Sequence, residues 1–162
     1  MSENVIKYDK KRVMFVCHGN ICRSPMAEFI FKDILRQHGR ESDFFVSSSA
    51  TSNEEIWNGV GNFVYPPARA ELEKHGLRCD GKRAVRLTKE DYGKYDLFIC
   101  MDCNNVRNAL RIFGSDPQGK VSKLMEHTTR GGDVADPWYT DRFDVTYRDI
   151  LEGCKGLYEE LK

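Results

Sequence analysis

Apolar residues along this chain follow two alternating patterns, one typical of buried strands and one typical of amphipathic helices. Short apolar runs predict strands over 12–16, 43–48, 95–101 and 120–125. Apolar residues at helical spacing predict helices over 25–37, 66–75, 104–113 and 147–161. Because the strands alternate with the helices, we expect an α/β protein with a parallel sheet.

Polar segments lie around these elements. Residues 1–11 are polar and are predicted to form a flexible N-terminal extension, and the polar run 49–55 predicts a loop after the second strand. Pro66 stands at the start of the second helix and Gly76 just past its end, which is the usual asymmetry of helix ends. Since no repeat and no long linker divides the chain, we expect residues 12–162 to form one domain.

Composition narrows the class of protein. The chain has 162 residues, and its 25 Lys and Arg balance its 25 Asp and Glu, so the formal net charge is zero. This balance does not favour a nucleic-acid-binding or membrane-binding surface. No apolar stretch approaches the length of a membrane span, and the N-terminus lacks the apolar middle of a signal peptide. Six cysteines are too few for a disulfide scaffold, so we expect a cytoplasmic protein in a reducing compartment.

The residues best suited to catalysis and anion binding lie between the first predicted strand and the first predicted helix. It reads Cys17-His18-Gly19-Asn20-Ile21-Cys22-Arg23-Ser24. Ligands of open α/β sheets bind beyond the carboxyl ends of the strands, where Cys17 falls. Gly19 permits a tight turn. We therefore expect the backbone amides from Gly19 to Ser24 to bind a dianion, together with the N-terminus of the following helix.

Three side chains of this segment suit phosphate chemistry. An electropositive loop favours the thiolate of Cys17, which is the nucleophilic form. The planar guanidinium of Arg23 matches two phosphate oxygens at once. The Ser24 hydroxyl can donate a hydrogen bond to the sulfur. The alternative is a buried cysteine in a glycine turn beside a surface arginine, but the position between strand and helix favours a phosphate-binding loop.

The run VMFVCHGNICRSPMAE resembles the N-terminal segment of the low-molecular-weight protein tyrosine phosphatases. The resemblance extends through 87–91, 101–102 and 136–139, and so covers nearly everything after residue 11. It implies a single three-layer domain in which helices flank a twisted, four-stranded parallel sheet of the flavodoxin-like or Rossmann-like type. It also implies hydrolysis of protein phosphotyrosine through a cysteinyl-phosphate on Cys17. Because Arg23 and the loop amides offset the phosphate charge, no metal or other cofactor is expected.

Asp136 is the candidate general acid, because a phenolate leaving group needs a proton. Pro137 restricts Asp136 to an extended backbone, and a neighbouring thiolate and phosphate favour the protonated carboxyl. An Asp-Pro pair is also an ordinary turn. The acid role is favoured by the family's matching Asp-Pro-aromatic-aromatic motif.

We expect aromatic side chains to line the part of the site that binds the aryl group of the substrate, called the aryl slot below. By the resemblance, Trp57, Trp138 and Tyr139 fall where the family places wall and specificity residues. Core packing is the alternative for Trp57. The family usually has two tyrosines after the Asp-Pro, so Trp138 is a departure that should change peptide preference and not chemistry. The loop residues His18 to Cys22, with Ser24, are assigned to phosphate or substrate binding.

Further roles follow from the resemblance. Asn20 and Ser48 match positions that brace the loop through side-chain hydrogen bonds. The family often adds a histidine to this network, and Lys82 stands in its place, so the network is either lost or rebuilt. Cys22 is implied to form a reversible disulfide with Cys17 under oxidation, with a simple filler side chain as the alternative.

Two other activities share this fold. Protein-arginine phosphatases carry a threonine where Ile21 stands, so Ile21 favours an aryl substrate. Thioredoxin-coupled arsenate reductases use two further cysteines, and Cys100 and Cys103 lie near that region. This lone C-x-x-C has no second ligand pair for zinc.

A catalytically inactive phosphotyrosine-binding module is a third alternative. The joint presence of Cys17, Arg23 and Asp136 argues against it. The expected partners are therefore a phosphotyrosine-containing protein or peptide, and inorganic phosphate or oxyanion inhibitors. We expect a monomer, with a weak dimer as the alternative.

Overall fold

A computed structural model of the protein describes residues 10–162, so most of the expected extension at 1–11 lies outside the described residues. Its central sheet has four strands, in the order β2-β1-β5-β6, and every neighbouring pair is parallel. The strands are β1 (Lys11–Cys17), β2 (Phe44–Ala50), β5 (Leu97–Cys100) and β6 (Val121–Lys123). The predicted four-stranded parallel sheet is thus confirmed, and Lys11, expected in the extension, already belongs to β1.

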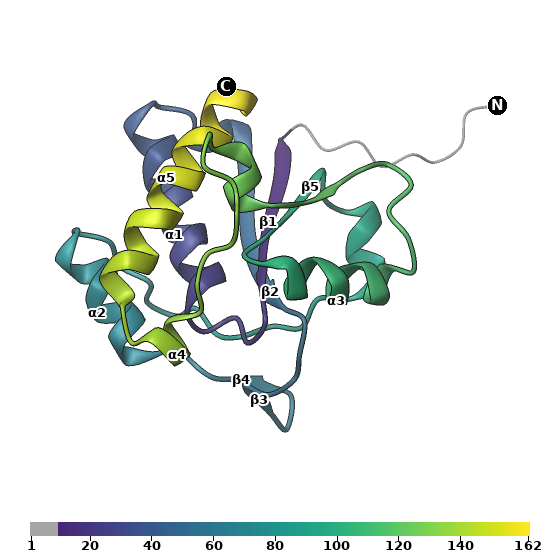
Figure 1. The fold of residues 1–162 in the computed structure, drawn as a ribbon, viewed down its shortest axis with the longest axis horizontal. Helices are drawn as coiled ribbons and strands as arrows, with labels where there is room; N and C mark the ends of the chain where they lie inside the picture. The colour runs from purple at the N-terminus through teal and green to yellow at the C-terminus, as the bar shows by residue number, and fades with distance from the viewer. Residues whose placement is uncertain (1–9) are drawn as a thin grey trace.

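Helices cover both faces of the sheet (Figure 1). On one face lie α1 (Arg23–Gln37), α2 (Pro66–Lys74) and α5 (Phe143–Leu161), and on the other lies α3 (Cys103–Phe113). The alternation along β1 explains this layering, since successive side chains of a strand point to opposite faces. Val13, Phe15 and Cys17 belong to the larger core under α1 and α5, whereas Met14 and Val16 belong to the smaller core under α3. The expected three-layer α/β architecture is confirmed.

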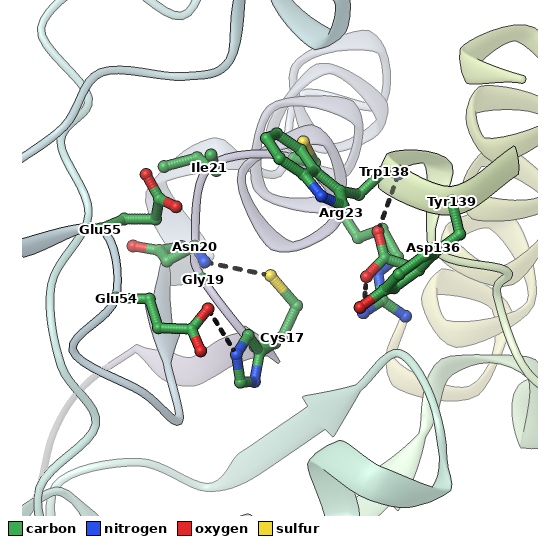
Figure 2. Close-up of a pocket in the computed structure, with 12 residues that line it drawn as sticks. Cys17, Gly19, Asn20, Ile21, Arg23, Glu54, Glu55, Asp136, Trp138 and Tyr139 are labelled. Carbon is green, nitrogen blue, oxygen red and sulfur yellow. Dashed lines mark hydrogen bonds and ion pairs between the residues drawn. The ribbon is translucent and has the colours of Figure 1, made fainter. Parts of the chain in front are cut away.

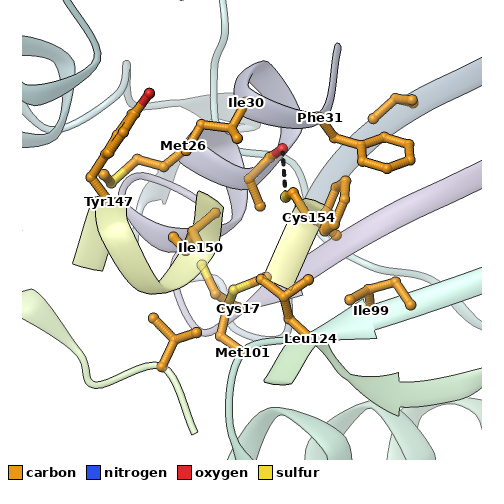
Figure 3. Close-up of a cluster of buried hydrophobic side chains, with 14 of the residues drawn as sticks. Cys17, Met26, Ile30, Phe31, Ile99, Met101, Leu124, Tyr147, Ile150 and Cys154 are labelled. Atoms are coloured by element: carbon orange, nitrogen blue, oxygen red, sulfur yellow. Dashed lines mark hydrogen bonds between the residues drawn. The ribbon is translucent and has the colours of Figure 1, made fainter. Parts of the chain in front are cut away.

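The larger core lies directly beneath the loop that follows β1. Figure 3 shows side chains of α1 and α5 meeting those of β5 and of the segment after β6. Cys17 belongs to the same buried cluster. Phe31, Ile99 and Leu124 are fully buried there, and so is Cys154. Cys154 is therefore a core residue, as its place on the apolar face of the last helix predicts.

Several short elements were not predicted. A two-stranded hairpin joins β3 (Ile56–Trp57) to β4 (Val60–Gly61), and a short helix, α4, covers Pro137–Thr140. Single 3₁₀ turns at Glu41–Asp43 and Leu124–His127 were not predicted either, whereas the one at Lys89–Gly93 lies where the sequence Leu87-Thr88-Lys89-Glu90 predicts a short helical turn. Among residues 10–162, no helix is long and apolar enough to cross a membrane.

Candidate active site

The loop after β1 surrounds the Cys17 sulfur with hydrogen-bond donors. Cys17 is the last residue of β1 and is buried. The Asn20 backbone N–H donates to Cys17 Sγ at 3.3 Å, and Ser24 Oγ lies 3.0 Å from the same sulfur. Asn20 has a φ of 60°, in the left-handed region that asparagine enters more readily than most residues. The loop thus turns sharply enough to direct an amide back toward the thiol.

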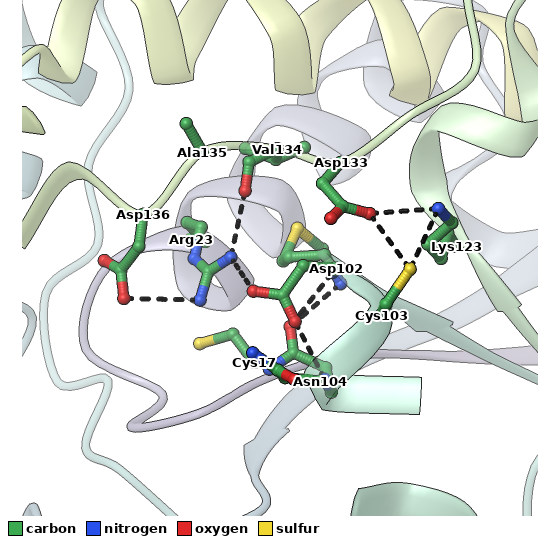
Figure 4. A network of polar contacts seen from close by, with 12 residues as sticks. Cys17, Arg23, Asp102, Cys103, Asn104, Lys123, Asp133, Val134, Ala135 and Asp136 are labelled. Carbon is green, nitrogen blue, oxygen red and sulfur yellow. Dashed lines mark hydrogen bonds and ion pairs between the residues drawn. The ribbon is translucent and has the colours of Figure 1, made fainter. Parts of the chain in front are cut away.

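Arg23 is the first residue of α1, and only 3% of its surface is exposed. Its Nη1 donates to Asp102 Oδ2 at 2.7 Å and to the Val134 carbonyl at 3.0 Å (Figure 4). Its Nη2 lies 3.5 Å from Asp136 Oδ2. Burial disfavours the charged guanidinium, but the negative groups Cys17, Asp102 and Asp136 outweigh this effect and raise the pKa of Arg23. Arg23 is therefore a fixed positive charge beside the thiol.

Asp136 lies across the pocket from the loop. It caps the N-terminus of α4, where its Oδ1 accepts the Trp138 backbone N–H at 3.0 Å. Pro137 occupies the first position of that helix, which is a favourable place for proline. The structure therefore brings Asp136, 119 positions from Cys17 in the chain, into the same pocket as Cys17 and Arg23.

The pocket has a loop floor and two walls (Figure 2). The floor is formed by Cys17 to Arg23, one wall by Glu54 and Glu55, and the other by Asp136, Trp138 and Tyr139. His18 Nε2 lies 3.0 Å from Glu54 Oε2 and joins the floor to the first wall. Trp138 and Tyr139 are exposed, at 58% and 85%. The second wall thus offers aromatic area at the pocket mouth.

Trp57 is not among the residues that line this pocket, so the structure does not bring it to the slot as the sequence predicted. The alternative of core packing does not hold either, because Trp57 is 78% exposed. The hairpin explains both outcomes. Trp57 pairs with Val60 at the outer end of the β3–β4 hairpin, whereas Glu55, two residues earlier, reaches the pocket.

The expected bracing contacts of the loop are present. Asn20 Nδ2 donates to Ser24 Oγ at 2.7 Å and to Ser48 Oγ at 2.9 Å, and its Oδ1 accepts the Val85 N–H at 3.0 Å. Lys82 Nζ donates to the Ser48 carbonyl at 3.1 Å. The network is therefore rebuilt around Lys82 and not lost.

Asp102, the partner of Arg23, and the pocket residues Glu54 and Glu55 were not predicted from the sequence. Asp102 directly follows β5, so its place at the carboxyl edge of the sheet was the available signal. The two glutamates lie in the polar run 49–55 that predicts a loop. The hairpin follows directly, and its Asn58-Gly59 turn is a strong hairpin signal.

The two cysteines of the C-x-x-C form no disulfide. Cys100 is buried and Cys103 is exposed, and both are free. Cys103 Sγ instead lies 3.4 Å from Lys123 Nζ and 3.6 Å from Asp133 Oδ1. Within residues 10–162, no group of three or more His, Cys, Asp and Glu side chains is placed to hold a metal ion.

A cysteine at the base of a strand-to-helix loop, with a buried arginine and an aspartate facing it, is typical of cysteine-dependent phosphatases. The family model described as low molecular weight phosphotyrosine protein phosphatase matches residues 12–162. The chain belongs to this family, whose members are hydrolases.

Individual relatives agree with this assignment. The chain is 31% identical to the low molecular weight protein-tyrosine-phosphatase YfkJ of Bacillus subtilis, over 93% of this chain and 95% of that protein. It is 32% identical to the low molecular weight phosphotyrosine protein phosphatase of Sus scrofa, over 94% and 96%. Among solved structures, YfkJ superposes with a TM-score of 0.88 at 30% identity, covering 94% of each chain. SP-PTP of Streptococcus pyogenes superposes with a TM-score of 0.83 at 34% identity, covering 94% of this chain and 93% of that one.

Proposed function

We propose that this protein hydrolyses protein phosphotyrosine through a cysteinyl-phosphate intermediate. The observation that carries the proposal is the convergence of Cys17, Arg23 and Asp136 on one pocket. In the first step, Cys17 Sγ attacks phosphorus in line with the tyrosyl oxygen, so an S–P bond forms as the P–O bond breaks. Arg23 and the loop amides stabilise the equatorial oxygens, and Asp136 protonates the departing phenol.

The second step returns the enzyme to its starting state. Asp136, now ionised, removes a proton from a water molecule that attacks phosphorus. The S–P bond breaks, inorganic phosphate forms, and Cys17 leaves as a thiolate. The Ser24 hydroxyl and the Asn20 N–H, both at hydrogen-bond distance from the sulfur, stabilise that leaving thiolate.

The walls of the pocket support an aryl substrate. Trp138 and Tyr139 present ring surface beside Asp136, and Ile21 adds an apolar side chain on the loop. His18 and Gly19 complete the floor next to the thiol. We therefore expect small aryl phosphates to be hydrolysed as well, and inorganic phosphate or other oxyanions to inhibit.

Cys22 is proposed to protect the nucleophile. Burial, and next the charge of Cys17, raise the pKa of the Cys22 thiol, so it stays protonated in the resting enzyme. Peroxide would then oxidise the Cys17 thiolate to a sulfenic acid, and Cys22 would displace water from it to form the disulfide.

Trapping the intermediate tests the proposal. The Asp136→Ala variant is incubated with an aryl phosphate, quenched in acid and mapped by mass spectrometry. Phosphate on the Cys17 peptide is the expected result, and it should be absent from the Cys17→Ser variant. Turnover by Cys17→Ser would overturn the proposed role of Cys17. Since neither step uses a metal, EDTA should leave turnover unchanged.

A further inference from the structure

Tyr65 contacts both the loop floor and the aromatic wall of the pocket without lining the pocket itself. It is the residue before α2, and its backbone N–H donates to the Ile21 carbonyl of the loop at 2.8 Å. Its ring centroid lies 5.0 Å from that of Trp138, with an angle of 53° between the two rings. Tyr65 is half-buried and is not among the residues that line the pocket. It therefore joins the floor to the wall from outside the substrate site.

Trp138 is in turn connected to Asp136 through the backbone of α4. The Trp138 N–H donates to Asp136 Oδ1 at 3.0 Å, which caps this helix (Figure 2). The other carboxylate oxygen, Oδ2, lies 3.5 Å from Arg23 Nη2, which is long for a hydrogen bond. Because α4 has only four residues, its own hydrogen bonds give it little stability. The direction of the Asp136 carboxyl thus depends on what holds α4.

Tyr65 links α4 to the body of the protein. Trp138 and Tyr139 are both more than half exposed, so much of the surface of α4 faces solvent. The Tyr65 ring packs against the larger core and lies 6.1 Å from the ring of Phe143, the first residue of α5. Aromatic pairs have preferred geometries, so a ring that is itself fixed restricts the ring packed on it. Tyr65 therefore restricts where Trp138, and with it α4, can lie.

We propose that Tyr65 is a positioning residue for the general acid: its ring holds Trp138, and through α4 it keeps the Asp136 carboxyl directed at the departing phenol. The inference rests on the proposed acid role of Asp136. It adds to the role of Trp138 as a wall of the aryl slot, because it makes proton transfer depend on a residue that does not line the pocket.

The first test compares two substrates that need the acid to different degrees. Phenyl phosphate has a poor leaving group, whereas p-nitrophenyl phosphate releases a more acidic phenol that needs less protonation. The variants are Tyr65→Ala and Tyr65→Phe, both of which keep the backbone bond to Ile21. Tyr95→Ala is the matched control, because Tyr95 is also a partly buried tyrosine in contact with a phenylalanine ring, but it packs in the smaller core. The quantity compared is kcat/KM, which reports the steps up to departure of the phenol.

We expect Tyr65→Ala to lower kcat/KM on phenyl phosphate by roughly tenfold, because displacement of a catalytic group by about 1 Å can cost about 10²-fold. The same variant should leave p-nitrophenyl phosphate hydrolysis and vanadate affinity nearly unchanged, since Arg23 keeps its bond to Asp102. Tyr65→Phe should behave like the parent protein, because the ring makes the contact with Trp138. Tyr95→Ala should not change the ratio of the two substrates.

The second test observes Trp138 directly. The chain has two tryptophans, so in a Trp57→Phe background the fluorescence comes from Trp138 alone. We expect Tyr65→Ala to increase the quenching of this fluorescence by acrylamide, because the ring loses the partner that covers one side of it. Tyr65→Phe should leave quenching unchanged.

Equal losses on the two substrates, or no loss on either, in a folded Tyr65→Ala variant would overturn the inference. Unchanged quenching of Trp138 would overturn it as well. If Tyr65→Ala does not fold, Tyr65→Leu takes its place, because leucine keeps apolar volume but has no ring, and the same outcomes decide. Failure of the proposed acid role is distinguishable, since Asp136→Ala would then lower kcat/KM equally for both substrates.

Discussion

Arg23 Nη1 and Asp102 Oδ2 form a hydrogen-bonded ion pair at 2.7 Å, although 79 positions separate the two residues. Arg23 begins α1 and Asp102 caps the N-terminus of α3, so the pair links helices on opposite faces of the sheet. Asp102 itself is fixed by the Asn105 N–H, which its Oδ1 accepts at 2.8 Å. The guanidinium that should bind phosphate is therefore aimed by a residue outside the loop.

Asp102→Asn should weaken both catalysis and oxyanion binding. A hydrogen bond to a charged group is worth about 1.5–3 kcal/mol, so we expect kcat/KM on an aryl phosphate to fall by roughly ten- to a hundredfold. Vanadate inhibition should weaken in parallel. Asp133→Asn is the control, because Asp133 lies at the same sheet edge but contacts Lys123 and Cys103. Equal effects of the two substitutions would show that the Arg23 contact is not the cause.

Asp136→Ala should lower turnover far more than oxyanion affinity. Loss of a general acid costs about 10²–10⁴-fold in rate, whereas vanadate has no leaving group that needs a proton. The loss should be larger for phenyl phosphate than for an aryl phosphate whose phenol is a stronger acid. Steady-state kinetics with both substrates check this. An equal fall in turnover and vanadate binding would contradict the assignment of Asp136 as the acid.

Trp57→Ala should change recognition of peptides and leave small substrates unaffected. Trp57 is exposed and lies outside the pocket, in the hairpin that begins directly after the pocket residue Glu55. We expect KM for phosphotyrosine peptides to rise severalfold while kcat/KM for phenyl phosphate stays the same. Phe63→Ala provides a control at another exposed aromatic residue, whose ring lies 3.9 Å from the Arg83 guanidinium carbon. A parallel loss on both substrates would place Trp57 in the slot after all.

Peroxide should link Cys17 to Cys22. Mass mapping of the oxidised protein should find this bridge, and reductant should restore activity. In Cys22→Ser, Cys17 should proceed to irreversible sulfinic or sulfonic acid. Cys154→Ser, which changes a thiol that is fully buried away from the pocket, should behave like the parent protein. An unlinked, overoxidised Cys17 in the parent protein would refute the protective role of Cys22.

Asp116 should make stability depend on acid pH. Burial alone would raise the pKa of Asp116, but hydrogen bonds from Tyr92, Val121 and Lys120 outweigh it and lower that pKa below the usual 3.8. A lowered carboxyl pKa stabilises the fold above the usual value, and this contribution disappears as the pH falls through the lowered one. Melting temperatures of the parent and Asp116→Asn should therefore differ most near neutral pH and converge as the pH falls through the lowered pKa of Asp116. A difference that is independent of pH would contradict this account.

The fold was largely predictable because its main elements carry strong local patterns. The continuous apolar run of β1 and the apolar face of α5 each indicate one structure, and the loop from Cys17 to Ser24 has a specific spacing. Short elements were not predictable to the same degree. The hairpin has only two residues in each strand, and α4 only four, so neither has enough residues for periodicity to be seen.

The site was less predictable than the fold, because many of its contacts join residues that are far apart in the sequence. Asn20 and Ser48 were predictable only from the resemblance, and Asp102 only as a polar residue at a strand end. The pairing of Lys82 with Glu28 depends on where β2 and the 83–86 segment meet, as the bridge between Ala50 and Arg86 shows. Trp57 is not among the residues that line the pocket because it stands in the β3–β4 hairpin, an element that the sequence did not predict. Contacts between residues far apart in sequence leave no pattern in one chain alone.

The most direct test of the account is phosphate release from matched phosphotyrosine, phosphoserine and phosphoarginine peptides, with EDTA present and with Cys17→Ser as the blank. Hydrolysis of phosphotyrosine by Cys17 predicts release from the phosphotyrosine peptide alone, and none from Cys17→Ser. Preferred release from phosphoarginine would contradict the aryl slot formed by Ile21, Trp138 and Tyr139. No release from any peptide would contradict the proposed phosphatase activity itself, and would make arsenate reduction the activity to test next.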